Sequence, residues 1–189
     1  MWQAQVFTLY PEFYPGPLSK GLYGKALAKN LWNLKVINIR DAAEDKHKTV
    51  DDTPYGGGSG MLIKADVLAK SLDKNKIKGE KIIYLSPKGK VFNQKLAQDL
   101  SLEKSFSLIC GHFEGVDERL LSTRNIEEIS IGDYVLSGGE SAALVVLDSI
   151  LRLLPGVLGN DKSSIDETFE NGLLAVSYTH LTLPTKRIV

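Results

Sequence analysis

Residues Ser130 to Glu140 read Ser-Ile-Gly-Asp-Tyr-Val-Leu-Ser-Gly-Gly-Glu. This stretch interleaves three glycines with four apolar residues: Gly132, Gly138 and Gly139 with Ile131, Tyr134, Val135 and Leu136. Glycine permits close backbone approach and apolar side chains wall a pocket, so the mixture favours a backbone folded tightly around a small ligand. A helical pattern follows it, which places the glycines where amide groups collect at a helix N-terminus. An ordinary strand-turn-helix corner is the alternative interpretation.

Two further stretches have the same context. Tyr84 to Gly89 reads Tyr-Leu-Ser-Pro-Lys-Gly, and Cys110 to Arg119 reads Cys-Gly-His-Phe-Glu-Gly-Val-Asp-Glu-Arg. Each follows an apolar run and precedes a helical pattern. Loops at the carboxyl ends of parallel strands meet at one edge of a sheet, where open α/β folds bind ligands. We therefore predict a ligand site built from these three loops.

Along the whole chain, apolar runs alternate with helical patterns. We expect strands at 3–9, 35–39, 82–85, 106–110 and 126–131, and helices at 18–34, 62–72, 93–100, from 117 with Asp117 as N-cap, and at 141–154. The alternation predicts an α/β fold with a mainly parallel sheet. The last helix is apolar on more than one face, which indicates burial in the sheet packing and in a subunit interface.

Composition narrows the class of protein. The 189 residues carry 23 Lys plus Arg and 23 Asp plus Glu, so the net charge gives no indication of a nucleic-acid partner. A local basic patch is compatible with these totals. The single cysteine, Cys110, rules out an internal disulfide framework and ends an apolar run, as a buried inert thiol would. No stretch has the roughly 18 apolar residues of a membrane span, and no secretion signal begins the chain. We expect a cytoplasmic protein without a membrane partner.

The segment from Arg40 to Gly60 is a long polar connection that ends in Tyr-Gly-Gly-Gly-Ser-Gly. Loops of this length are functional or mobile, and both interpretations stay open. No Lys-Ser/Thr pair follows the glycines, so they do not form a phosphate loop, and Met61 breaks the dinucleotide-binding spacing. His47 has no second histidine or cysteine at ligand spacing, so we expect no metal site.

These stretches together resemble the bacterial tRNA (guanine-N1) methyltransferases, which methylate the guanosine just 3′ of the anticodon (guanosine-37). The resemblance covers roughly residues 1–174. It rests on the opening Met-Trp, on Phe7 to Phe13, Asp51 to Met61, Tyr84 to Pro87, Cys110 to Arg119, Ser130 to Glu140, Pro155 to Gly159 and Phe169 to Leu174. The Arg40 to Gly60 loop would then be the lid or wall on the side of the target base.

The resemblance implies a SPOUT-like fold, with a C-terminal trefoil knot in the sheet, and an obligate homodimer. It implies residues 1–159 as the knotted domain that binds S-adenosylmethionine and carries out catalysis. The cofactor-binding positions implied are Tyr84, Leu85, Pro87, Gly111, Ile131, Gly132, Asp133, Tyr134, Val135, Leu136, Gly138 and Gly139.

The reaction needs two further groups, because guanine N1 carries a proton and charge develops on O6. The resemblance implies Arg152 as the donor to O6 and Glu167 as the base, with Asp166 as the alternative base. From the residues alone, both acids are also compatible with a solvated linker, and Arg152 with a cation at a helix C-terminus. A divalent ion such as Mg²⁺ that binds through the substrate would leave no sequence signature.

The resemblance also divides the C-terminal part of the chain. Residues 160–174 correspond to an interdomain linker that carries the catalytic carboxylate. Residues 175–189 are expected to be a non-matching tail, in place of a helical C-terminal domain that helps to hold tRNA. Two other functions stay open: a fragment that binds cofactor but is impaired in catalysis, and a related knotted RNA methyltransferase with another target.

Overall fold

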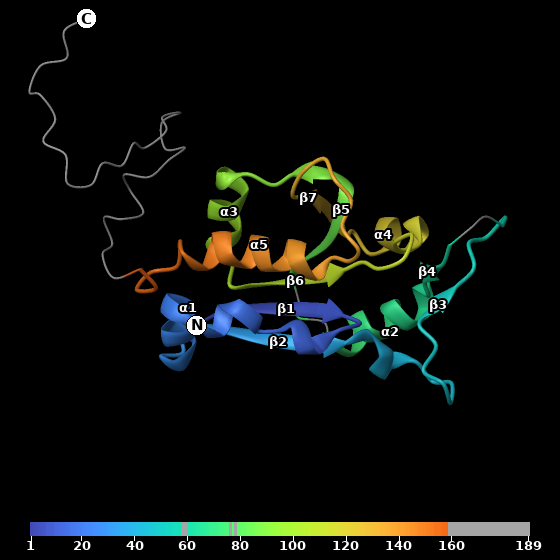
Figure 1. Ribbon diagram of the computed structural model, residues 1–189, viewed down its shortest axis with the longest axis horizontal. Coiled ribbons are helices and arrows are strands. Elements are labelled where there is room, and N and C mark those ends of the chain that lie inside the picture. Colours follow the sequence, from blue (N-terminus) through green and yellow to red (C-terminus); the bar gives the residue numbers. More distant parts are fainter. Residues whose placement is uncertain (58–59, 76, 78, 159–189) are drawn as a thin grey trace, which may run out of the picture.

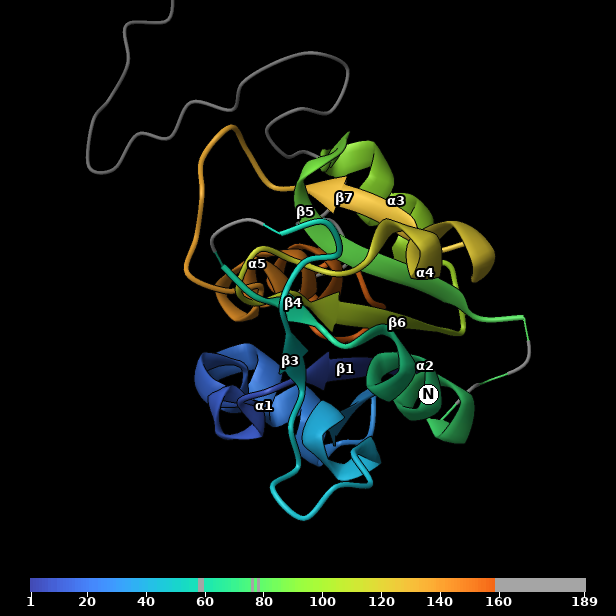
Figure 2. The ribbon, with the colours of Figure 1, turned by 90° about the vertical axis from the view of Figure 1, so that its right-hand side faces the viewer.

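A computed structural model describes residues 1–57, 60–75, 77 and 79–158. Its main sheet has the order β2-β1-β6-β5-β7, and every neighbouring pair is parallel. Figure 2 shows β7, β5, β6 and β1 one above another. The bounds are β1 Trp2–Thr8, β2 Trp32–Asn38, β5 Lys81–Val91, β6 Ser105–Cys110 and β7 Glu127–Ser130. The predicted α/β class with a mainly parallel sheet is confirmed.

Helices cover both faces of this sheet, because side chains alternate along each strand. Along β6, for example, Leu108 and Cys110 belong to one buried apolar cluster and Ile109 to the other. The first cluster includes residues of α1 (Gly21–Ala28), α3 (Gln94–Ser101) and α5 (Glu140–Leu151). The second includes residues of α2 (Ala65–Asn75) and α4 (Glu118–Thr123).

Short elements complete the fold. Three 3₁₀ helices cover Pro11–Phe13, Gly16–Ser19 and Ile39–Ala42, and a small antiparallel pair joins β3 (Asp51–Asp52) to β4 (Leu62–Ile63). β3 therefore lies inside the long polar connection from 40 to 60, and β4 follows directly after it.

Two predicted helices have bounds that differ from the observed ones. The helix expected at 18–34 ends at Ala28, because Asn30 takes a positive φ of 56° and Trp32 begins β2. Trp32 is fully buried and donates its indole N–H to the carbonyl of Tyr23 at 3.0 Å, so core packing overrides the helical spacing. The helix expected at 62–72 begins at Ala65, since the two residues of β4 pair with β3.

The predicted loop at Tyr84 to Gly89 is instead part of β5. The pairing of β5 with β7 shifts register between Leu85 and Lys90, which both lie opposite Ile129. The intervening residues form a bulge, which bends the strand and turns it away from regular pairing. A strand end was predicted here from the sequence, whereas β5 bulges and continues to Val91. The trefoil knot stays a prediction.

Candidate active site

The sheet carries a cavity of about 320 Å³ at the points where β6 and β7 end and β5 bulges. This volume lies at the lower end of the range typical of small-ligand sites. Its walls come from residues 84–88, 111–116, 128–132 and 134–139, together with a few side chains of α4 and α5. The three stretches singled out in the sequence therefore do meet at one edge of the sheet.

Eleven of the twelve predicted cofactor-binding residues line this cavity, and the exception is Asp133. Of the predicted catalytic groups, Arg152 does not line it. Glu167 and its alternative Asp166 lie outside the described residues.

The glycines of the cavity are required by close contacts. The amide of Gly139 donates to the carbonyl of Gly111 at 2.9 Å, and Gly138 forms a bridge with His112. A Cβ atom at Gly138 would lie within 3 Å of both the His112 ring and the carboxylate of Glu140. Only glycine lets these two segments pass each other without displacing those side chains.

Tyr84 forms the inner wall. A Cβ atom on Gly111 would lie 2.7 Å from the hydroxyl of Tyr84, so the ring packs directly on that glycine. Burial raises the pKa of the Tyr84 phenol, with the charge of Glu128 adding to the rise and a backbone hydrogen bond from Val116 opposing it. The phenol therefore stays protonated and serves as a wall rather than as a base.

The charges around the cavity have an acidic excess. Glu114, Glu118 and Glu128 line it, whereas the lining includes only one basic side chain with a permanent charge, Lys88. A cavity with negative walls attracts cationic groups. The site is therefore suited to a ligand that carries a positive centre.

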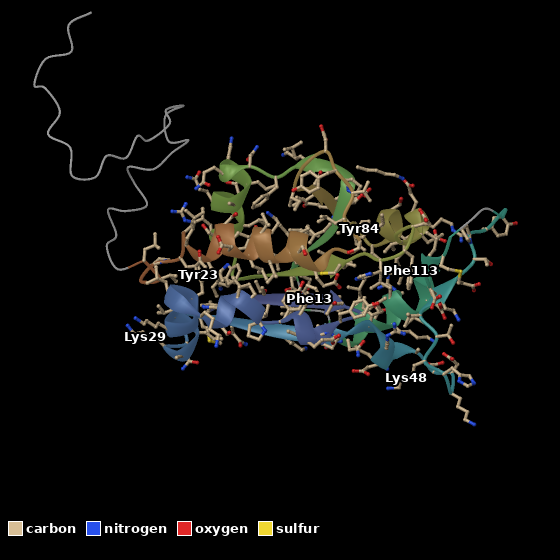
Figure 3. All side chains as sticks on the ribbon, viewed as in Figure 1. Phe13, Tyr23, Lys29, Lys48, Tyr84 and Phe113 are labelled. Carbon is tan, nitrogen blue, oxygen red and sulfur yellow. The ribbon has the colours of Figure 1, made fainter. Side chains whose placement is uncertain are left out.

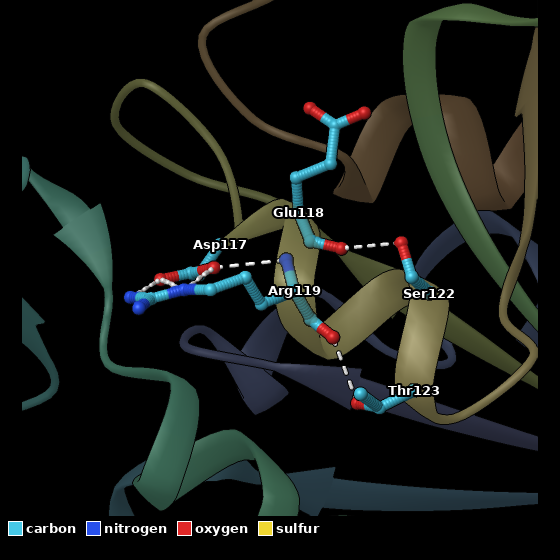
Figure 4. A network of polar contacts seen from close by, with 5 residues as sticks. All are labelled: Asp117, Glu118, Arg119, Ser122 and Thr123. Carbon is cyan, nitrogen blue, oxygen red and sulfur yellow. Dashed lines mark hydrogen bonds and ion pairs between the residues drawn. The ribbon is translucent and has the colours of Figure 1, made fainter.

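The first turn of α4 is held by a compact polar network (Figure 4). Asp117 accepts from the backbone amide of Arg119 at 2.9 Å and from its guanidinium at 2.6 Å, which confirms the predicted N-cap. The hydrogen bonds to Arg119 lower the pKa of Asp117 to about 2. This cap sets the start of the helix whose first residue, Glu118, faces the cavity.

The segment that follows the long polar connection is joined to the cavity wall. The amide of Glu114 donates to the carbonyl of Met61 at 2.9 Å, and the amide of Ile63 donates to that of Gly115 at 3.0 Å. The chain around β3 and β4 is thereby placed beside the 111–116 wall.

A buried polar cluster beside the cavity was missed by sequence reasoning. Glu140 is 3% exposed and binds both Thr8 and His112, at 2.6 and 2.7 Å. One signal was available, since Glu140 directly follows Gly138-Gly139 and opens a largely apolar helix. Nothing in the sequence pointed to Thr8, which lies 132 residues away.

Beneath the cavity, Cys110 is fully buried, and its Sγ lies 3.3 Å from the Tyr14 hydroxyl. Burial raises the pKa of the Cys110 thiol. The expectation of a buried cysteine is confirmed, and the raised pKa makes it a poor nucleophile.

Arg152 lies at the opposite end of α5 from the cavity. It is the C-cap residue of a 12-residue helix that begins beside the cavity, so about 18 Å of helix separates the two. Burial and a hydrogen bond with Asp148 raise the pKa of Tyr23 to about 12, and the nearby guanidinium of Arg152 opposes that rise. Figure 3 shows Tyr23 far from the cavity residues Tyr84 and Phe113.

Within the described ranges, no three His, Cys, Asp or Glu side chains gather closely enough to hold a metal ion. Among the helices of those same ranges, none combines the length and the apolar character that a membrane span requires.

Comparison with known proteins gives consistent matches. A model of the family described as tRNA (Guanine-1)-methyltransferase TrmD matches residues 2–186, and so extends past residue 174, where the resemblance noted in the sequence ended. A tRNA (guanine-N(1)-)-methyltransferase from Pelagibacter ubique (strain HTCC1062) is 76% identical over 184 residues, covering 97% of this chain and 80% of the relative. The protein of the same name from Bartonella quintana (strain Toulouse) is 56% identical over 173 residues, covering 92% of this chain and 74% of the relative.

Proposed function

The chain belongs to the tRNA (guanine-1)-methyltransferase family, and from this premise we propose how its residues transfer a methyl group from S-adenosylmethionine to N1 of guanine in tRNA. The observation that carries the proposal is the cavity, in which eleven of the residues implied by the family resemblance come together. The target is the guanosine on the 3′ side of the anticodon, and the reaction takes place in the cytoplasm, where tRNA is found.

The cavity has the properties that S-adenosylmethionine requires. Gly138 and Gly139 leave room for backbone contacts, Leu85 and Ile131 supply apolar wall, and the acidic excess suits a sulfonium ion. The cofactor, when bound, supplies an electrophilic methyl group. The residues of the cavity bind and orient it, and exclude water from it.

The remaining chemistry concerns the guanine. Glu167 takes the proton from N1, and Arg152 donates hydrogen bonds to O6 as negative charge develops there. Asp166 is the alternative base. The side chain of Glu167 is one methylene longer than that of an aspartate, and Asp166 is its neighbour in the chain.

The position of Arg152 supports the proposal that two copies of the chain form each site. A guanidinium reaches about 7 Å from its backbone, far less than the roughly 18 Å between Arg152 and the cavity along α5. We therefore propose a homodimer in which the cavity of one copy faces Arg152 of the other. The exposed apolar side chains of Phe13 and of Val145 on α5 would supply the interface.

The knot belongs to the same proposal. Residues 131–139 contact residues 110–112 at two points, the hydrogen bond from the amide of Gly139 and the bridge at Gly138. A chain threaded through a loop would need such contacts. A Mg²⁺ ion, where one takes part, would bind through the tRNA phosphates rather than through a protein cage. A chelator would then slow methyl transfer without weakening the binding of S-adenosylmethionine.

Single substitutions test the assigned roles. Glu167→Gln and Arg152→Ala should each lower kcat by about 100-fold or more, while calorimetry shows unchanged affinity for S-adenosylmethionine. Asp166→Asn is the matched control and should stay within a few-fold of wild type. If Asp166→Asn is inactive and Glu167→Gln active, the base is Asp166. Full activity of both acid variants and of Arg152→Ala would refute the mechanism.

Subunit mixing tests the two-copy site. Gly111→Val should block the cavity by pressing on Tyr84, and Arg152→Ala should remove the donor. When the two inactive variants are dissociated and reassociated together, a mixed dimer contains one intact cavity that faces one intact Arg152. Recovered activity supports the shared site. Two proteins that stay inactive when mixed, despite measured exchange of subunits, would contradict it.

A further inference from the structure

We infer that Glu140 is a positioning residue for the cofactor cavity, acting through His112. This inference rests on the proposed function. Glu140 touches neither tRNA nor cofactor in that scheme, and it is not among the residues that line the cavity. It is nonetheless a nearly buried carboxylate at the first residue of α5, directly after the two glycines.

Both oxygens of this carboxylate have a partner. Thr8 Oγ1 lies 2.6 Å from Oε1, and His112 Nε2 lies 2.7 Å from Oε2. The Thr8 hydroxyl already accepts from the amide of Tyr10 at 2.9 Å, so its own proton points to Glu140. The positive end of α5 adds to the stabilisation of the negative charge.

This arrangement selects one form of His112. An ionised carboxylate can only accept, so the proton between the two residues resides on Nε2 of His112. In the neutral ring, Nδ1 is then the acceptor. The ring of Tyr10 packs against the imidazole edge to face at 4.9 Å, which holds the ring in the orientation that the carboxylate selects.

His112 in turn belongs to the cavity. It is one of the lining residues, and its Cε1–Nε2 edge faces Gly138 so closely that no Cβ fits between them. Its carbonyl accepts from the amide of Gly115 at 3.0 Å and so closes the turn that carries Phe113 and Glu114. Glu140 therefore holds together the ends of β1 and β6 and the start of α5, and thereby the shape of the wall.

Glu140→Gln tests this role with minimal change in shape. It replaces two acceptors by one oxygen and one NH₂ group, so either Thr8 or His112 loses its acceptor. We expect the dissociation constant for S-adenosylmethionine to rise at least 10-fold, with kcat at saturating cofactor within about 3-fold of wild type. His112→Gln should raise the dissociation constant similarly, and the double variant should be no weaker than the single variants, because both changes break one contact.

Two controls separate positioning from general destabilisation. Glu103→Gln makes the same chemical change in a partly exposed partner of Lys81 and should leave binding unchanged. Thr8→Val removes the other donor to Glu140 but keeps the His112 contact. It should therefore lower the Tm and leave the affinity for S-adenosylmethionine nearly unchanged. All titrations are done well below the lowest measured Tm.

Nitrogen-15 NMR of the imidazole tests the contact between Glu140 and His112 without any cofactor. Wild type should show His112 protonated at Nε2, and Glu140→Gln should lose this signature; His112→Gln identifies the signal among the three histidines. Unchanged binding and an unchanged tautomer in Glu140→Gln would overturn the inference. A wild-type chain with the expected tautomer but no affinity for S-adenosylmethionine would instead refute the cofactor assignment. The contact between Glu140 and His112 would still hold.

Discussion

Gly139 packs against the backbone of Cys110: a Cβ atom at position 139 would lie 2.7 Å from the Cα of Cys110 and 2.9 Å from the amide nitrogen of Gly111. The start of α5 and the end of β6 are thus in direct backbone contact at the base of the cavity. Backbone atoms cannot rotate away as a side chain can, so this contact tolerates no side chain.

Gly139→Ala should therefore lower the free energy of unfolding by about 1–3 kcal/mol, as overpacking of a core does. Gly111→Ala is the matched comparison, because the added methyl group meets the ring of Tyr84, which can shift into the cavity. We expect Gly111→Ala to weaken binding of S-adenosylmethionine more than it destabilises the fold. Denaturant titration and calorimetry measure the two effects, and equal stability of Gly139→Ala and wild type would contradict the packing described.

The cap of α4 predicts a dependence of stability on pH. The pKa of Asp117 is about 2 in the folded protein, against an ordinary value of 3.8, because Arg119 favours the charged form. A lowered pKa means that the folded state binds this proton less tightly than the unfolded state. Its stabilising contribution is therefore present above pH 4 and is lost as pH falls from about 4 to 2.

Two variants at this position separate the cap from the charge. Asp117→Asn keeps a capping oxygen and should lose only the pH-dependent part of the stabilisation. Asp117→Ala should also lose the cap, which lowers the free energy of unfolding by about 1 kcal/mol more. Urea denaturation between pH 2 and 7 measures both. A wild-type advantage over Asp117→Asn that grows toward pH 2 would show that the sign is wrong.

Glu80 predicts the opposite dependence. Burial raises its pKa, with hydrogen bonds from Ser107 and Gln5 opposing the rise. The folded state therefore binds this proton more tightly, so stability falls as pH rises above the ordinary value of 4.5. Oε1 of Gln5 and Oε1 of Glu80 are also buried without a hydrogen-bond partner.

Glu80→Gln should accordingly raise the Tm at pH 7, by on the order of a degree or two, because it removes the charge while its side-chain oxygen can still accept from Nε2 of Gln5. The gain should shrink as pH is lowered toward 4.5 and should not change further below that value. Differential scanning calorimetry measures the shift, with Glu103→Gln as the partly exposed control. A lower Tm for Glu80→Gln at pH 7 would mean that the carboxylate is stabilising as it stands.

The proposed interface makes a prediction about assembly. Phe13 and Val145 are each 47% exposed in the single chain, and a dimer would cover them. Val145→Glu or Phe13→Glu should shift the mass measured by sedimentation equilibrium from dimer to monomer, and should lower kcat for tRNA methylation with it. Leu102→Glu, at a position that is 85% exposed on the end of α3, should leave the dimer intact. Dimers of unchanged stability in both interface variants would place the interface elsewhere.

The parallel sheet and the cavity could be predicted because their signals are local. Each of the three wall segments has its own apolar run and contains or directly precedes a glycine, and parallel strands bring such ends together. The bulge in β5 could not be predicted, since it depends on pairing with Ile129, far along the chain. The Thr8–Glu140 contact and the burial of Trp32 are likewise tertiary, and no periodicity in the sequence records them.

The predicted helix at 141–154 already placed Gly139 and Arg152 near its opposite ends, and α5 confirms that separation. In the sequence, Arg152 is 13 positions from Gly139, and both had been assigned to the same reaction. If both have the proposed roles, their places at the two ends of α5 favour a second copy at each site.

The central claim is methyl transfer to N1 of one guanosine in tRNA. The purified 189-residue chain would be incubated with isotope-labelled S-adenosylmethionine and a tRNA transcript that carries guanosine 3′ of the anticodon. Nuclease digestion and mass spectrometry then locate the label. We predict labelled 1-methylguanosine at that position and none in a transcript with adenosine there. Label at another atom or position, or equal labelling of both transcripts, would contradict the account.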